Sequence, residues 1–183
     1  KESRQSVYRL RSKCDAVIVG GGTVRADNPL LTSRGLTNQE PLRVVLTNEI
    51  NIPKNSQILD TSKVSTLIAY GSKNIDKSLF NSQDGLELLR LDSLDPINLM
   101  NSLGERGCNR VLWECGSKLA SEVIKQNCVQ ELYIFLAPKL LGGANAMTPT
   151  ADLGLQSMNE VISIEQLNFQ KFGQDFFLNM LLK

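Results

Sequence analysis

The sequence predicts an α/β fold with a mostly parallel sheet and antiparallel strands at its C-terminal end. Three observations support this fold class. Short apolar runs alternate with helix-like stretches along most of the chain, several of these runs end at glycine, and the last two flank Gly173. The length of 183 residues is typical of one domain with one core.

Eight segments are predicted to be strands because they are short, largely apolar runs, the first of them also rich in β-branched residues. They are residues 16–19, 43–47, 64–70, 86–91, 110–114, 132–137, 161–169 and 175–182. Three helices are predicted: residues 2–12, a helix capped by Ser93 or Asp95 with Pro96 in its first turn, and a helix that follows Gly116–Ser117. The polar stretches 54–63 and 73–84 are expected to be loops or short helices, and residues 138–143 a loop.

The composition excludes several classes of function. Lys and Arg total 20 against 19 Asp and Glu, so the net charge of +1 favours neither nucleic acid nor an anionic membrane as a partner. No apolar stretch approaches the roughly 18 residues of a membrane-spanning helix, and the opening residues do not resemble a signal peptide. The sequence has no histidine, which excludes Ser-His-Asp and Cys-His catalytic sets within it. The four cysteines lack metal-binding spacing, so we expect no metal and a reduced, cytoplasmic protein.

Glycine-rich turns follow three of the predicted strands, at Gly20–Thr23, Gly71–Ser72 and Gly116–Ser117. In open α/β sheets, ligands bind outside the carboxyl ends of the strands. The segment Glu114–Leu119 is a strand end, a tight turn and a helix start, which would suit a pyrophosphate but is equally typical of an ordinary strand-to-helix turn. The Rossmann and Walker glycine patterns do not occur, so neither of those motifs would hold a nucleotide here.

A second group of polar residues lies in Thr23–Arg34, where a hydroxyl, a carboxylate, an amide and a guanidinium follow the first glycine run. The guanidinium matches a phosphate or carboxylate in shape, whereas Asp27-Asn28-Pro29 is also a common turn sequence. Glu114 is expected to bind a polar ligand or to be a solvated strand end. Trp113 points to the opposite face and is expected in the core.

Three motifs in order resemble the pyrimidine reductases of riboflavin synthesis: residues 19–34 (VGGGTVRADNPLLTSR), 113–119 (WECGSKL) and 129–143 (VQELYIFLAPKLLGG). The resemblance implies a dihydrofolate-reductase-like three-layer sandwich that uses NADPH. It also implies a reaction, the reduction of 5-amino-6-(5-phosphoribosylamino)uracil to the ribitylamino product at C1′ of the opened sugar. The family member would be an oxidoreductase with a phosphorylated ribosylamino-pyrimidine as its substrate.

The resemblance assigns roles residue by residue. The cofactor would contact Thr23, Asp27, Asn48, Gly116, Ser117, Lys118, Leu119, Ala120, Ser121 and Glu122, with Asn48 standing where the family more often has serine. The substrate would contact Arg11, Leu31, Arg34 and Glu114, of which the two arginines suit the ribose 5-phosphate. Asp27 and Glu114 would lie nearest the reacting groups and are the candidate catalytic residues.

The chain departs from the family pattern at its start. The family's first strand and the zinc-dependent deaminase domain that usually precedes it are not found in residues 1–183, which are expected to form a single reductase domain. Three alternatives stay open: a reductase of the related 2,5-diamino pyrimidinone phosphate, a pterin reductase, and a non-catalytic nucleotide-binding relative. The resemblance further implies a homodimer, in which the apolar strand 176–182 either joins the interface or is buried in its own sheet.

Overall fold

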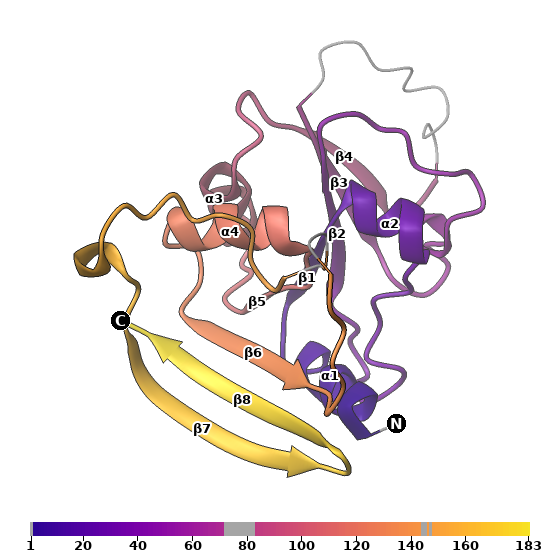
Figure 1. The fold of residues 1–183 in the computed structure, drawn as a ribbon. Coiled ribbons are helices and arrows are strands. Elements are labelled where there is room, and N and C mark those ends of the chain that lie inside the picture. Colours follow the sequence, from indigo (N-terminus) through magenta and orange to yellow (C-terminus); the bar gives the residue numbers. More distant parts are fainter. Residues whose placement is uncertain (1, 72–82, 144–145, 147) are drawn as a thin grey trace. The chain divides into compact units, whose positions relative to one another are not determined.

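The computed structural model describes residues 2–71, 83–143, 146 and 148–183 (Figure 1). In chain order the helices are α1 (Glu2–Arg11), α2 (Gly21–Asp27), α3 (Pro96–Glu105) and α4 (Ser117–Lys125), with short 3₁₀ turns at Gln57–Leu59 and Met158–Glu160. The strands are β1 (Ala16–Gly20), β2 (Leu42–Thr47), β3 (Thr66–Tyr70), β4 (Leu86–Arg90), β5 (Val111–Trp113), β6 (Glu131–Leu136), β7 (Ile164–Phe172) and β8 (Asp175–Leu182). Each predicted strand is present, although β7 begins and ends three residues later than predicted.

The strands form two sheets, which confirms the α/β class with parallel strands followed by antiparallel ones. The chain divides into two compact units: residues 7–116, and residues 117–183 together with those up to Ser6. The first unit holds a five-stranded parallel sheet in the order β4-β3-β2-β1-β5, and the second an antiparallel sheet in the order β6-β8-β7. The turn residue Ser72 and most of the stretch 73–84 lie outside the described residues, and 138–143 is a loop as predicted.

The parallel sheet is buried on both faces, which explains why its strands are continuous apolar runs. Val17, Val19 and Val45 pack into a cluster with the helix and loop residues that cover one face. Ile18 and Val44 lie side by side on the other face and are also fully buried. The sheet is therefore a rigid base, and its strand ends are held in register by a core on each side.

The segment Gly20–Thr23 is not the glycine-rich turn that the sequence predicts, because helix α2 begins within it. The helix starts at Gly21, directly after β1, and ends at Asp27, followed by the cap residue Asn28 in a left-handed conformation with φ 42°. A Cβ at Gly21 would lie 2.5 Å from Oγ1 of Thr47, so the helix packs against the end of β2 where a larger residue would clash. The two glycines in its first turn disfavour a helix by local propensity, so local sequence gave no indication of α2.

The second exception to the sequence pattern is Arg43, which is a charged residue inside a strand predicted as apolar. Its side chain is 1% exposed. The guanidinium donates hydrogen bonds to the carbonyls of Gln57, Asp60 and Val64 at 3.2, 2.7 and 2.6 Å. Burial lowers the pKa of the Arg43 guanidinium. The hydrogen bonds of Arg43 thus hold the long connection between β2 and β3 against the sheet.

The antiparallel sheet is built around the aromatic ring of Phe177 on the central strand β8. Tyr133, Phe135 and Phe172 pack on this ring with centroid distances of 5.9, 4.9 and 5.4 Å. Most of β8 is half-buried between its two neighbours, so the apolar strand 175–182 is satisfied largely by its own sheet. In α4, Ser121, Val123 and Ile124 are buried.

Candidate functional site

Polar residues gather at the carboxyl edge of the parallel sheet, where β1, β2, β3 and β5 all end. Parallel strands bring these ends to one edge: Gly20 of β1 pairs with Leu46 of β2, and Ile18 of β1 pairs with Trp113 of β5. The residues that follow these strands are the start of α2, Asn48, Gly71 and Glu114. Ligands of open α/β folds bind at this kind of edge.

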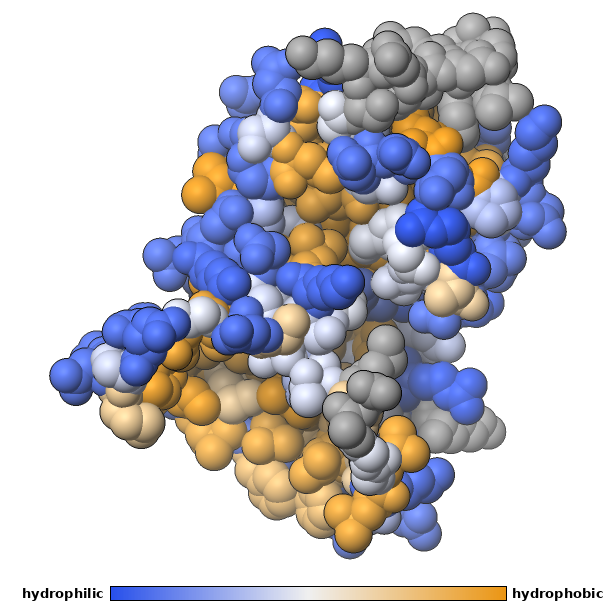
Figure 2. All heavy atoms as spheres, turned by 45° about the horizontal axis from the view of Figure 1, so that its top comes forward, coloured by the Kyte–Doolittle hydropathy of each residue, from blue (hydrophilic) through white to orange (hydrophobic). Residues whose placement is uncertain are grey.

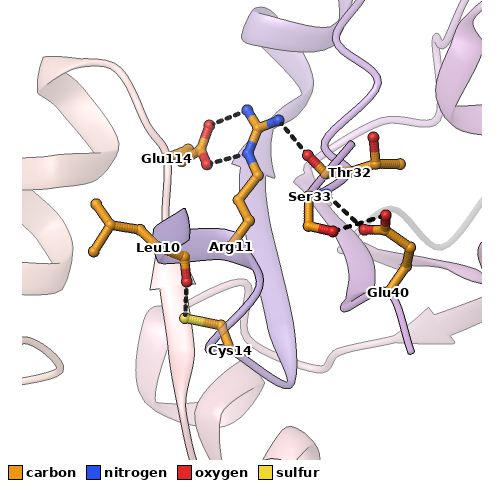
Figure 3. Close-up of polar contacts among 7 residues, drawn as sticks. All are labelled: Leu10, Arg11, Cys14, Thr32, Ser33, Glu40 and Glu114. Carbon is orange, nitrogen blue, oxygen red and sulfur yellow. Dashed lines mark hydrogen bonds and ion pairs between the residues drawn. The ribbon is translucent and has the colours of Figure 1, made fainter. Parts of the chain in front are cut away.

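Glu114 is held at this edge by Arg11, the last residue of α1 (Figure 3). The guanidinium binds the carboxylate with two parallel hydrogen bonds, Nε to Oε1 at 2.6 Å and Nη2 to Oε2 at 2.7 Å. Its third bond goes to the carbonyl of Thr32 at 3.0 Å. The side chains are 12% and 24% exposed, so the pair is largely shielded from solvent. This fixed geometry leaves Glu114 oriented and its charge balanced.

Arg34 is the second arginine of this group, and it differs from Arg11 in having no carboxylate partner among the residues that the structure describes. Its guanidinium lies over the ring of Tyr8, 5.9 Å from the centroid, and that of Arg11 lies 5.8 Å from the same centroid. Tyr8 precedes Arg11 by one helical turn, which places both on one face of α1. The cluster of Tyr8, Arg11, Arg34 and Glu114 thus has an uncompensated positive charge at Arg34.

Leu31 lies in the same loop as Arg34, but its side chain is 1% exposed and belongs to the hydrophobic core. Both residues have a left-handed backbone, with φ 56° at Leu31 and 60° at Arg34. Only the main chain of Leu31 is therefore available for a ligand contact, whereas Arg34 presents its whole side chain.

Thr23 and Asp27 are one turn apart on α2, on the same side of the helix. Asp27 is exposed, and no contact joins it to the cluster around Tyr8 in the described part of the chain. Asn48 is exposed after β2, and its Oδ1 lies 3.2 Å from the point where a Cβ on Gly71 would stand. The structure brings Arg11, Arg34 and Glu114 into one cluster and places Thr23, Asp27 and Asn48 after neighbouring strands.

The remaining residues that resemblance assigns to the cofactor follow β5. Gly116 is exposed, and a Cβ there would meet no atom within 4 Å, so its backbone is open to a ligand. Ser117, Lys118, Leu119, Ala120, Ser121 and Glu122 are the first six residues of α4 in the second compact unit. Ser121 differs from the others in being buried, with its hydroxyl lacking a partner in the described chain.

The two cysteines near the cluster do not add a nucleophile. Burial raises the pKa of the Cys115 thiol to about 11. Burial also raises the pKa of Cys14, whose Sγ donates to the carbonyl of Leu10 at 3.2 Å (Figure 3). Because a thiolate is the reactive form, neither cysteine is activated. The site is suited to binding and orienting a ligand rather than to attacking it.

Sequence reasoning did not single out three residues of this edge. Tyr8 could have been found from the sequence, because residues three positions apart on a helix, such as Tyr8 and Arg11, share one face. No sequence pattern indicates the other two residues, because their contacts depend on the fold. Glu40 binds the loop of Arg34, and Arg25 donates to Oδ1 of Asn51 at 2.5 Å. Among the described residues, no group of three or more acidic or cysteine side chains is placed to hold a metal ion. In the same part of the chain, none of the helices has the length and apolar composition of a membrane span.

Comparison with known proteins identifies the family. Residues 1–178 match the family described as the RibD C-terminal domain. The chain is 42% identical over 176 residues to the riboflavin biosynthesis protein RibD of Synechocystis, covering 95% of this chain and 48% of the relative. It is 26% identical over 167 residues to a 2,5-diamino-6-ribosylamino-4(3H)-pyrimidinone 5′-phosphate reductase of Aquifex aeolicus, covering 90% of this chain and 75% of that one.

A solved structure agrees with these sequence matches. Acinetobacter baumannii RibD superposes with a TM-score of 0.83 at 25% identity, over 100% of this chain and 50% of the other. The chain thus spans about half the length of the RibD proteins that it matches. The fold is dihydrofolate-reductase-like, as the motif resemblance predicts, and the chain belongs to the RibD C-terminal domain family.

Proposed function

We propose that this chain is an NADPH-dependent pyrimidine reductase, which reduces 5-amino-6-(5-phosphoribosylamino)uracil to 5-amino-6-(5-phosphoribitylamino)uracil. The observation that carries the proposal is the cluster of Tyr8, Arg11, Arg34 and Glu114 at the carboxyl edge of a sheet of this family. The cluster offers a free guanidinium for a phosphate and an oriented carboxylate for the pyrimidine or ribose, which are the two polar parts of this substrate.

The reaction needs little from the protein beyond binding and orientation. The ribosylamine opens to an imine at C1′, a hydride adds to C1′ and a proton adds to the nitrogen, so the C=N bond becomes a C–N single bond. A nicotinamide cofactor supplies the hydride when bound, and the protein fixes the geometry between donor and acceptor. No histidine or activated cysteine is required for this chemistry.

Each residue of the cluster has a separate task in this proposal. Arg34 binds the 5-phosphate, because its charge has no carboxylate partner in the described chain. Arg11 orients Glu114 through its two hydrogen bonds rather than binding phosphate alone. Glu114 accepts hydrogen bonds from the N–H or O–H groups of the substrate, and its fixed position determines which part of the substrate faces the cofactor.

Thr23, Asp27 and Asn48 are proposed to contact the cofactor, with Asp27 near the reacting ring. The residues present fit such a ligand: a hydroxyl, a carboxylate and an amide follow neighbouring strands, and the exposed backbone of Gly116 is open on the side where a Cβ would stand. A phosphate approaches a backbone most closely at glycine. Gly116 and the first six residues of α4 are proposed to bind the pyrophosphate.

The choice of NADPH over NADH has its own support at Arg25. This exposed arginine of α2 folds back toward the start of its own helix, with its Nη1 3.3 Å from the Cβ position of Gly21. Its hydrogen-bond partner is the neutral amide of Asn51, so its positive charge is not cancelled by that contact. NADPH differs from NADH by one phosphate, and a guanidinium whose charge is not balanced by a carboxylate, on the same helix as the proposed cofactor residues Thr23 and Asp27, would supply the counter-charge.

The decisive test compares the two ribosylamino-pyrimidine phosphates as substrates of the full-length protein. We expect turnover of the uracil compound with NADPH, measured as loss of the nicotinamide absorbance. Faster turnover of the 2,5-diamino pyrimidinone would favour the alternative that the Aquifex relative represents. Turnover of neither compound, together with NADPH binding in calorimetry, would favour a non-catalytic nucleotide-binding relative.

The wider setting of the chain is also a proposal. Because RibD relatives are about twice as long as this chain, we propose that a deaminase domain accompanies it in the full-length protein. None of the four cysteines, all of which lie in the described part of the chain, forms a disulfide, which is typical of a reduced compartment and supports a cytoplasmic location. We propose a homodimer formed through β7, an edge strand on which Leu167 is 55% and Phe169 60% exposed.

Apolar side chains gather over the three-stranded sheet in Figure 2. On β7 the exposed apolar residues Ile164, Leu167 and Phe169 stand among polar ones that include Glu165 and Lys171, and in the described chain the strand pairs with β8 on one side alone. These apolar side chains can form a self-complementary patch, because two copies related by a two-fold axis present the same side chains to each other. A second copy of this chain is therefore the proposed occupant.

A further inference from the structure

The loop that carries Arg34 has an unusual backbone. Leu31, Arg34 and Gly35 all have positive φ angles, of 56°, 60° and 81°. For residues other than glycine this left-handed region is unfavourable, so a loop with two such residues needs contacts that hold it. Leu31 has such contacts, since its side chain is buried in the core. Arg34 is exposed, and its conformation must be held by its neighbours.

Glu40 supplies these contacts (Figure 3). Its Oε2 accepts a hydrogen bond from the backbone N–H of Ser33 at 2.5 Å, and its Oε1 accepts from Ser33 Oγ at 2.8 Å and from the N–H of Gly35 at 3.2 Å. The two N–H groups stand immediately before and after Arg34. One carboxylate therefore clamps both sides of the residue, with hydrogen bonds strengthened by its charge.

The same loop is attached to the cluster by its preceding residue. The carbonyl of Thr32 accepts from Nη1 of Arg11, which is itself bound to Glu114. Arg34 follows this attachment by two residues and lies between the two N–H groups that Glu40 binds, and its guanidinium is directed over Tyr8. Glu40 thus connects to the substrate-binding cluster through the backbone on both sides of Arg34.

We infer that Glu40 is a positioning residue for substrate binding: it holds residues 33–35 in the conformation that presents the Arg34 guanidinium to the substrate phosphate. The inference rests on the proposed function. Without the carboxylate, the backbone around Arg34 is free to leave the left-handed region, and the guanidinium no longer stands over Tyr8. Substrate binding weakens as a result, while the cofactor residues on α2 and after β2 are untouched.

The test measures KM and kcat in the full-length protein for wild type, Glu40→Ala, Glu40→Gln, Arg34→Ala and the double variant Glu40→Ala/Arg34→Ala. We expect Glu40→Ala to raise the substrate KM about tenfold, which corresponds to roughly 1.4 kcal/mol. We expect kcat and the KM for NADPH to stay unchanged. Glu40→Gln, which keeps one acceptor oxygen, should lie between wild type and Glu40→Ala.

The double variant separates positioning from a general structural effect. If Glu40 acts through Arg34, its removal adds nothing to the KM of Arg34→Ala. A substrate analogue without the 5-phosphate should bind wild type and Glu40→Ala equally. Glu87→Ala is the matched control, because Glu87 on β4 is another hydrogen-bonded carboxylate of the same unit, with Arg106 rather than the Arg34 loop as its donor, and its loss should leave the substrate KM unchanged.

The outcomes distinguish this inference from the proposed function. Additive effects of the two substitutions, or equal losses in kcat and in both KM values, would overturn the role of Glu40 while the reductase proposal stands. A wild-type protein that turns over neither ribosylamino-pyrimidine would overturn both. Amide hydrogen exchange at Ser33 and Gly35 is a second readout: it should speed up in Glu40→Ala, and unchanged exchange would contradict the clamp.

Discussion

At the scale of single residues, the site distinguishes two arginines that are equivalent in the sequence. Arg11 is bound to Glu114 by two hydrogen bonds and is 12% exposed, so its charge is largely used within the protein. Arg34 lies on the same tyrosine ring without such a carboxylate. A phosphate is expected to gain more from the uncompensated charge, because desolvating an already paired charge is costly.

Arg34→Ala is therefore expected to weaken substrate binding much more than cofactor binding. Loss of a charge-assisted hydrogen bond costs about 1.5–3 kcal/mol, or roughly a 10–100-fold rise in KM for the phosphorylated substrate. Calorimetric titration of NADPH should give the same Kd for the variant and wild type. Equal weakening of both ligands would show that Arg34 does not bind the substrate phosphate.

Arg25→Ala is expected to change the preference between cofactors. Removing the guanidinium should raise the KM for NADPH about tenfold and leave that for NADH near its wild-type value, because only NADPH carries the additional phosphate. Arg25→Lys keeps the charge and should retain part of the preference. A parallel loss for both cofactors would assign Arg25 to the folding of α2 instead.

At the level of single elements, helix α3 shows how one capping contact makes the stability of the protein depend on pH. Asp95 caps the helix: its Oδ1 accepts from the N–H of Asn98 at 2.9 Å, and Pro96 occupies the first turn. The backbone hydrogen bond from Asn98 lowers the pKa of Asp95 below its ordinary value. A lowered pKa means that the folded state favours the charged carboxylate, so the cap stabilises the protein above the ordinary aspartate pKa.

Asp95→Ala is accordingly expected to lower the free energy of unfolding by about 1 kcal/mol near neutral pH. The difference from wild type should disappear as the pH falls through the lowered pKa of Asp95, where the carboxyl group is protonated in the folded state as well. Urea denaturation at a series of pH values measures both effects. Asp92→Ala is the control, since its side chain is 98% exposed; a difference that persists at acid pH would contradict the cap.

For the molecule as a whole, strand β7 is notable because a single chain leaves its apolar side chains exposed to solvent. Its residues Leu167 and Phe169 project to one side of the sheet because they are two positions apart. Leu167→Asp is expected to convert the proposed dimer into a monomer, since a buried unpaired charge is unfavourable at an apolar interface. Sedimentation or light scattering gives the molecular mass directly.

The matched control for this variant is Ile97→Asp, at a residue of α3 that is 45% exposed and lies in the other compact unit. It should leave the oligomeric state unchanged. A wild-type protein that sediments as a monomer at all concentrations would end the dimer proposal. The NADPH-dependent activity of the monomeric variant then shows whether the site depends on a second copy.

Local patterns along the chain were sufficient to predict the strands and the residue types of the site. Buried parallel strands are apolar along their whole length, so runs such as 16–20 and 66–70 are visible locally. Motif order also identified the family, and with it Arg11, Arg34 and Glu114 as site residues. These features depend on composition and spacing within short segments, which a sequence displays directly.

Tertiary structure alone decided which of these residues act together. The pair Arg11–Glu114 joins residues 103 positions apart, and the short helix α2 exists because Gly21 packs against Thr47 despite a poor local propensity. Glu40 follows a polar loop that indicates nothing about its clamp on Ser33 and Gly35. Such contacts depend on strand order and backbone conformation, because the energy that selects them comes from packing between distant segments.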